Sequence, residues 1–161
     1  MNTQTLDILK ICKNIEEICA ELYFLYAEQF RDEPFLHKLW TKTAREELNH
    51  ANIIKLAINC QEVEFIGNAE SLAKYHEGEK VIQGVLTLAK ASQTTPLKSL
   101  ESAIEVEERL AAFHLDAVVD FRNNQDAGFF EALINSDRQH VEALISARDS
   151  IMSGQAGFAA E

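Results

Sequence analysis

The amino-acid sequence predicts an all-α protein: a four-helix bundle of two antiparallel helical hairpins, joined by a long crossover with short helices. Three features of the chain predict this. Apolar residues recur at helical spacing over four long segments, the breaks between those segments are short, and glycine (6) and proline (2) are rare. A chain of 161 residues most simply forms one domain, and we expect the bundle to cover 1–155, with a flexible tail at 156–161.

The first hairpin is predicted from two helical segments on either side of a short polar connection. The first helix should run over about 5–30 and the second over about 34–60. In the connection, Asp32 can cap the second helix, and Pro34 is tolerated in its first turn because no backbone donor is needed there. So short a loop makes the two helices antiparallel neighbours.

The crossover and the second hairpin follow. The crossover should span 68–94 and carry one or two shorter helices, because its apolar patches are brief. A Thr-Pro pair then begins a third long helix over about 95–121. A turn at 123–128 and a fourth helix over about 129–153, closed by Gly154, complete the second hairpin. No further sizeable helix fits after that glycine.

Composition and charge exclude several classes of function. The formal net charge of −11 argues against nucleic acid or an anionic membrane as a partner. No apolar run approaches the roughly 18 residues needed to span a bilayer. The first residues show no basic region leading into an apolar stretch, so no signal peptide is expected. The cysteines form no C-x-x-C pair and indicate a reduced, cytoplasmic protein; they are Cys12, Cys19 and Cys60.

One short pattern occurs twice, each time inside a predicted helix. Glu47 and His50 form the first acid–histidine pair, and Asp137 and His140 form the second. Residues three apart lie one turn apart on the same helix face, so both side chains of a pair can reach a single point. A carboxylate oxygen and an imidazole nitrogen that converge can ligate a transition metal. The repetition indicates two metal ions.

Both pairs fall in the middle of an apolar helix face. The neighbours at helical spacing are Leu36, Trp40, Thr43, Ile54 and Ala57 for the first pair, and Phe130, Leu133, Val141, Leu144 and Ile151 for the second. An unpaired charge in such surroundings is costly, so something must compensate it. The alternative to a metal is a salt-bridged network, which needs inward cations. The candidates, Arg122 and Arg148, lie toward the bundle ends, and this favours a metal.

The remaining two helices should each supply a carboxylate. Two hairpins joined by a long crossover are the outline of a ferritin-like bundle, where two helices each give a Glu and two each give a Glu-x-x-His. Glu16 and Glu107 have apolar helical neighbours, whereas the alternatives Glu17 and Glu108 border polar faces. The spacing from Glu16 to Glu47 is 47 − 16 = 31 residues, and from Glu107 to Asp137 it is 137 − 107 = 30. The predicted metal ligands are Glu16, Glu47, His50, Glu107, Asp137 and His140.

At these residues the chain resembles the rubrerythrin-like branch of the ferritin-like superfamily, over nearly all of its length. The matching motifs are Glu16-x-x-Cys19-x-x-x-Tyr23, Glu46-Glu47-x-x-His50-Ala51, Val106-Glu107-Glu108 and Asp137-x-x-His140. The resemblance implies a non-haem di-iron site that reduces hydrogen peroxide or dioxygen. Mn or Zn in place of iron is compatible with this ligand set.

The chain departs from that family in four ways. Its three cysteines cannot build a rubredoxin-type domain, so the electron donor must be a separate protein. The family's additional glutamate on the third helix would fall at Leu110. Asp137 stands where Glu is usual, and His114 where Tyr is common. Because Asp137 is a methylene shorter than Glu47, we expect it to bind just one ion.

Ligand chemistry suggests roles for the individual residues. Glu47 and Asp137 occupy the central, bridging positions, although the shorter Asp137 is expected to bind just one ion. Glu16 with His50 and Glu107 with His140 would complete one ion each. The four carboxylates would cancel the four positive charges of two Fe(II). Tyr23 and His114 each follow a predicted ligand by seven residues; they either contact the ligands from a second layer or pack in the core.

Two other functions stay open at this point. The same site could serve a ferroxidase or iron-handling protein, although the absence of a clear helix after the bundle counts against a storage cage. The chain could also be a non-catalytic helical interaction module, which metal content would reveal. Exposed apolar residues along the first helix favour a homodimer.

Overall fold

The protein is an all-helical bundle of five helices in the described part of the chain, and this confirms the predicted all-α class. The computed structural model describes residues 3–60, 64–67, 69–122 and 124–154; the predicted tail at 156–161 lies outside them. The helices are α1 (Thr3–Gln29), α2 (Pro34–Cys60), α3 (Ala69–Ala91), α4 (Pro96–Asp120) and α5 (Asn124–Met152).

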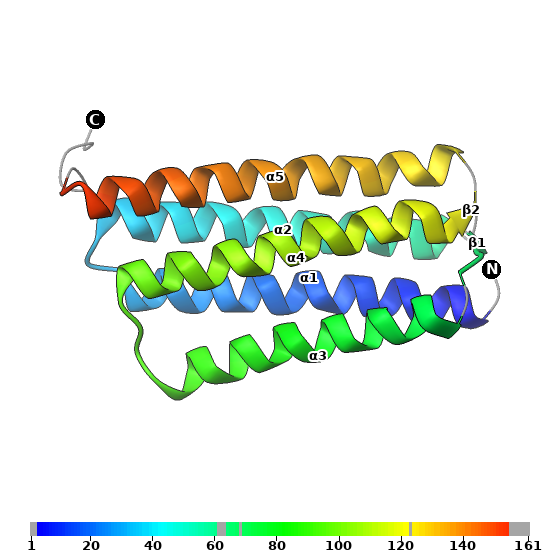
Figure 1. Ribbon diagram of the computed structural model, residues 1–161, viewed down its shortest axis with the longest axis horizontal. Coiled ribbons are helices and arrows are strands. Elements are labelled where there is room, and N and C mark those ends of the chain that lie inside the picture. Colours follow the sequence, from blue (N-terminus) through cyan, green and yellow to red (C-terminus); the bar gives the residue numbers. More distant parts are fainter. Residues whose placement is uncertain (1–2, 61–63, 68, 123, 155–161) are drawn as a thin grey trace.

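The two hairpins form as predicted, α1 packing along α2 and α4 along α5. Figure 1 shows that α1, α3 and α5 run in one direction and that α2 and α4 run in the other. The crossover therefore returns the chain along the length of the bundle, and the second helix of one hairpin is parallel to the first helix of the other. Figure 1 also shows that α1, α2, α4 and α5 extend over much the same length of the bundle, so their middles lie at a similar level.

Two predicted boundaries are corrected. The crossover carries a single helix, α3, which is within the predicted number, but at 23 residues it is longer than expected; α3 packs mainly on α1 and less on α4. Helix α5 begins at Asn124, five residues before the predicted start at Phe129. The segment 123–128 contains a glycine but no proline, and a glycine within a helix costs only about 1 kcal/mol. Such a cost is readily offset by packing of the helix.

A backbone link joins the ends of the hairpins. The strands β1 (Glu64–Phe65) and β2 (Phe121–Arg122) pair antiparallel, and the backbone N–H of Ile66 donates to the carbonyl of Asp120 at 2.7 Å. The pairing was not predicted, because two residues are too few to leave a period-2 pattern. It holds the start of the crossover against the end of α4.

Helix starts and stops follow local chemistry. The predicted start at Thr95-Pro96 is confirmed, since the backbone N–H of Lys98 donates to the Thr95 hydroxyl at 3.3 Å and so caps α4. After α5, Gly154 adopts a φ of 70°, the left-handed conformation that ends many helices. No described helix is long and apolar enough to cross a membrane.

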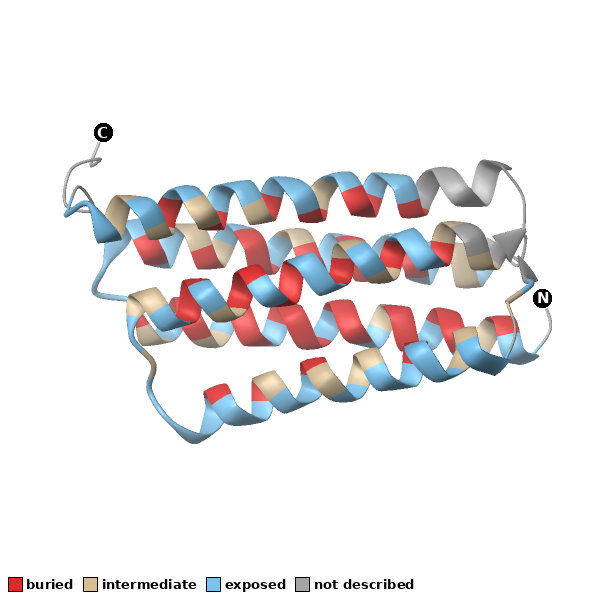
Figure 2. Cartoon of the chain, viewed as in Figure 1, coloured by how far each residue is buried: buried red, intermediate tan, exposed pale blue. Residues whose placement is uncertain are grey.

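The core lies along the inward faces of the helices, which appear as red stripes in Figure 2. Helix α1 is the most enclosed, with α2 on one side and α3 on another. Between the middle of the bundle and the α1–α2 connection, the Tyr23 ring stacks on Trp40 at a centroid distance of 5.7 Å, and both residues are fully buried. These rings form an apolar wall beside the polar residues described next.

Candidate metal centre

Seven ionisable residues meet in the middle of the bundle, on the inward faces of four helices. They are Glu16 from α1, Glu47 and His50 from α2, Glu107 and His114 from α4, and Asp137 and His140 from α5, and all of them are buried. All six predicted metal ligands are among them. The rejected alternatives Glu17 and Glu108 are exposed, so helical spacing selected the inward carboxylates correctly.

Five of the seven form two overlapping triads suited to a metal ion. One triad consists of Glu16, Glu47 and His50, and the other of Glu47, Glu107 and His140. Within each triad, one ligand atom per residue lies within 4.8 Å of the others. Glu47 belongs to both, so its carboxylate lies between the two positions, as the sequence suggested.

The two triad histidines are oriented alike. Nδ1 of His50 lies 3.0 Å from Glu47 Oε2 and 3.4 Å from Glu16 Oε2. Nδ1 of His140 lies 2.9 Å from Glu47 Oε1 and 3.2 Å from Glu107 Oε2. The rings are nearly parallel, with centroids 5.8 Å apart. Each imidazole therefore offers the same nitrogen to the carboxylates of its triad.

The outward nitrogens of these histidines have partners that the sequence analysis did not single out as site residues. Nε2 of His50 lies 3.0 Å from Ser136 Oγ, and Nε2 of His140 lies 3.2 Å from Glu46 Oε2. A metal-ligating histidine commonly donates its other N–H to such an oxygen, which fixes the ring. The only sequence signal is position: Ser136 and Glu46 each directly precede a predicted ligand, at the edge of its helix face.

Asp137 is not part of either triad. Its Oδ2 lies 2.8 Å from Nδ1 of His114, whose Nε2 lies 2.8 Å from Glu16 Oε1. His114 thus separates two buried carboxylates that would otherwise face each other. The predicted bridging role pairs Asp137 with Glu47, but in this structure the shorter side chain is held by an imidazole.

The Tyr23 hydroxyl donates a hydrogen bond to Glu107 Oε1 at 2.6 Å, across 84 residues of sequence. Tyr23 therefore contacts the predicted ligand Glu107 from a second layer, which was one of its two predicted roles. Burial and the nearby charge of Glu107 raise the pKa of the Tyr23 hydroxyl, so it keeps its proton at neutral pH. The hydrogen bond leaves the other oxygen, Oε2, directed at His140.

Electrostatics at the centre are dominated by burial and by mutual contact. Burial alone would lower the histidine pKa values, but Glu16 and Glu47 raise that of His50 to about 10, and Glu107 and Glu47 raise that of His140 to about 11. Burial also acts to lower the pKa of His114, but contacts with Asp137 and Glu16 outweigh it and raise that pKa to about 10. In the metal-free protein these imidazoles are therefore cations that balance the carboxylates.

The buried glutamates respond in opposite directions. Burial acts to raise the pKa of Glu16, but contacts with His114 and His50 outweigh it and lower the pKa to about 2. Burial and the charge of Glu47 raise the pKa of Glu107 to about 8, despite His140 and Tyr23. Protons are therefore shared unequally over the centre, and a bound cation would displace them.

The residues present fit a pair of divalent transition metals. Within the described part of the chain, both oxygens of Glu16, Oε1 of Glu47 and Oδ1 of Asp137 are buried without an aligned hydrogen bond. Several of them have an imidazole nitrogen at ion-pair distance but not in hydrogen-bond geometry. Buried carboxylate oxygens without donors are costly, and a metal ion would satisfy them.

Replacing His114 by leucine should destabilise the metal-free protein, because it leaves Asp137 and Glu16 buried without their shared cation. Breaking a buried ion pair costs about 3–5 kcal/mol, and urea denaturation would measure the loss. The control is His76→Leu on the exposed face of α3, which should leave the free energy of unfolding unchanged. Equal effects of the two substitutions would contradict a structural role for His114.

The fold and the centre together describe an all-helical bundle with a buried carboxylate–histidine cluster. No protein-family model, no curated protein and no solved structure matches the chain. Its interpretation therefore rests on the residues of the centre.

Proposed function

We propose that the protein is a ferritin-like di-iron carboxylate protein, a rubrerythrin-like oxidoreductase that reduces hydrogen peroxide or dioxygen at a buried non-haem centre. The observation that carries the proposal is the sharing of Glu47 by two buried triads, each completed by a histidine Nδ1. The parallel course of α2 and α4 across a long crossover supports the ferritin-like topology.

The chain's own residues would hold two ions and control the protons around them. Glu16 and His50 would ligate one ion, Glu107 and His140 the other, and Glu47 both. When bound, two Fe(II) ions would supply the two electrons that reduce hydrogen peroxide to water. Ser136 and Glu46 would accept the Nε2 protons and so leave each Nδ1 lone pair free to bind.

Two further residues would organise the carboxylates. Tyr23 keeps its hydroxyl proton and directs Oε2 of Glu107 toward the second triad. His114 holds Asp137 and Glu16 apart, as an imidazolium in the metal-free protein. Asp137 would reach an ion only if it moved away from His114, and we expect it then to bind just one ion.

The reductant that restores the centre would come from outside this chain, since no cluster of cysteines accompanies the two buried free thiols at 12 and 19 in the described residues.

We also propose a homodimer. Large exposed apolar side chains lie more on α2 than on α1: α1 contributes Phe24, and α2 contributes Phe35, Leu48, Ile53 and Leu56.

The test is metal analysis of anaerobically prepared protein, followed by stopped-flow oxidation. We expect about two iron ions per chain, as the two triads imply, and faster oxidation of the reduced form by peroxide than by dioxygen. Turnover should require an added reductant. If dioxygen reacts faster, and added Fe(II) is oxidised and retained in large excess over the site, the protein handles iron instead.

Two other outcomes of that analysis are informative. Stable binding of Mn or Zn in preference to iron would replace the redox centre by another di-metal site of the same geometry. If the protein never binds transition metal, the imidazolium–carboxylate network only stabilises the fold, and the chain is a helical interaction module.

A further inference from the structure

Helix α2 differs in charge from every other helix of this acidic protein. It holds four basic residues (Lys38, Lys42, Arg45 and Lys55) and two glutamates, so its formal charge is +2 in a chain of −11. Counted in the same way, α3 is neutral, and α1, α4 and α5 are each −3 or −4. Since Glu47 is buried, the surface of α2 shows four cations against Glu46 alone.

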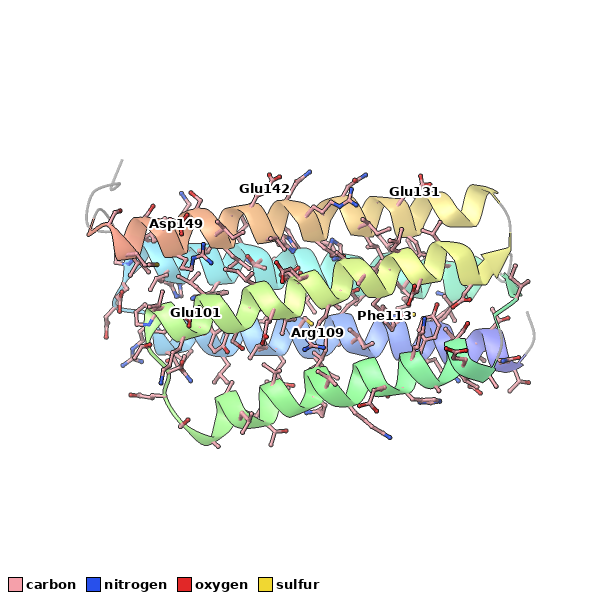
Figure 3. All side chains as sticks on the ribbon, in the orientation of Figure 1. Glu101, Arg109, Phe113, Glu131, Glu142 and Asp149 are labelled. Atoms are coloured by element: carbon pink, nitrogen blue, oxygen red, sulfur yellow. The ribbon has the colours of Figure 1, made fainter. Side chains whose placement is uncertain are left out.

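Three of these cations form one patch. Lys38, Lys42 and Arg45 follow helical spacing, are exposed, and line a shallow hollow of about 560 Å³ together with His37, Thr41 and Glu46. Within the described residues, neither Lys38 nor Arg45 has a carboxylate at ion-pair distance, whereas Lys42 contacts Glu46 at 3.2 Å. We call these three residues the basic patch. By contrast, the acidic side chains Glu131 and Glu142 project outward from α5 (Figure 3).

The basic patch lies beside the nearest approach of the centre to solvent. Glu16, Glu47, Glu107, His114 and Asp137 are 0% exposed, whereas His50 and His140 retain 6% and 4%. Glu46 joins the two regions: one of its oxygens faces Lys42 at 3.2 Å, and the other faces Nε2 of His140 at 3.2 Å. One half-buried side chain therefore separates the patch from a residue of the centre.

We propose that the basic patch of α2 docks an acidic one-electron redox protein, which delivers electrons to the centre past Glu46 and the edge of His140. This rests on the proposed function for the role of the partner, but the surface itself is defined by charge. Complementary charge accelerates encounter and fixes orientation, and it does so most strongly at low ionic strength.

The stoichiometry of the reaction suits such a donor. Reduction of one hydrogen peroxide to two waters takes up two electrons and two protons. Two molecules of a one-electron donor are oxidised in sequence, and the protons come from solvent. The donor must therefore bind reversibly and leave between the two transfers, as rim charges that are screened by salt allow.

The test uses a reduced plant-type [2Fe–2S] ferredoxin as the acidic probe and the double variant Lys38→Glu/Arg45→Glu. Both side chains are exposed, and within the described residues neither forms an ion pair with Glu46 or with a residue of the centre. We expect calorimetric binding of the probe at about 0.02 M salt to weaken by roughly tenfold or more in the variant, and native binding to fade at about 0.5 M. Electron transfer from the probe should slow in parallel.

The matched control is Lys74→Glu/Lys90→Glu on α3, which changes the net charge equally on another face and removes only exposed ion pairs with Asp116 and Glu21. Equal weakening by both double variants would show that total charge alone attracts the probe, and would overturn the docking surface. Lack of probe binding to the native protein would overturn it as well.

These outcomes are separate from those of the proposed function. Binding of the probe is measured with metal-free and with metal-loaded protein. A chain that binds no metal but binds the probe at α2 loses the redox role and keeps the surface. A chain that holds iron and reacts with peroxide, but binds the probe equally in every variant, keeps its function and loses the surface.

Discussion

Replacing Glu47 by alanine should abolish binding at both metal positions, because Glu47 belongs to both triads. We expect metal affinity to fall on the order of 100-fold or more, beyond the 10–100-fold typical of residues outside the ligand shell. Elemental analysis after anaerobic loading and titration with Co(II) would measure the loss. The nearly isosteric Glu47→Gln should behave similarly, which would separate lost ligation from a cavity left by alanine.

The matched control for this substitution is Glu21→Ala, on the solvent-exposed face of the bundle. Glu21 forms an exposed ion pair with Lys90 at 2.6 Å, and such a pair contributes little. Its metal content should equal that of the native protein. Loss of one ion rather than two in the Glu47 variants would show that the second triad binds independently of the bridge.

The metal-free protein should lose stability as the pH rises from about 6.5 to about 11. The folded-state pKa values of His50 and His140 are raised to about 10 and 11, so their stabilisation is complete below their ordinary value of 6.5 and is lost as pH rises through the folded values. Glu107, raised to about 8, acts in the same direction from 4.5 upward. Urea denaturation in a chelator at about pH 6, 8 and 10 would follow the fall.

The acidic limb and the metal-loaded protein supply the controls. Glu16, with a folded pKa of about 2, contributes stability above 4.5 that is lost as the pH falls toward 2. With metal bound, the trend above pH 6.5 should reverse, because fewer protons compete for the histidine Nδ1 atoms. An unfolding midpoint of the metal-free protein that stays flat or rises with pH would contradict the imidazolium assignment.

The sequence alone determined the features that depend on helical periodicity. The all-α class, the two hairpins and the cap at Thr95 follow from apolar spacing and helix-start signals. The same period placed Glu16 and Glu107 inside and Glu17 and Glu108 outside. A helix turns about 100° per residue wherever it lies in the fold, so the buried face is known before its neighbours are.

Other features were decided by tertiary structure. The length of α3 and the early start of α5 depend on packing that outweighs weak local signals such as a single glycine. Asp137 contacts His114 and does not join Glu47, which belongs to the other hairpin. This outcome depends on the distance between the hairpins, which decides whether a side chain one methylene shorter than Glu can reach across. The outward contacts to Glu46 and Ser136 join positions 94 and 86 residues apart. Periodicity gives the direction of a side chain within its own helix, whereas the rotation and separation of packed helices decide which atom it meets.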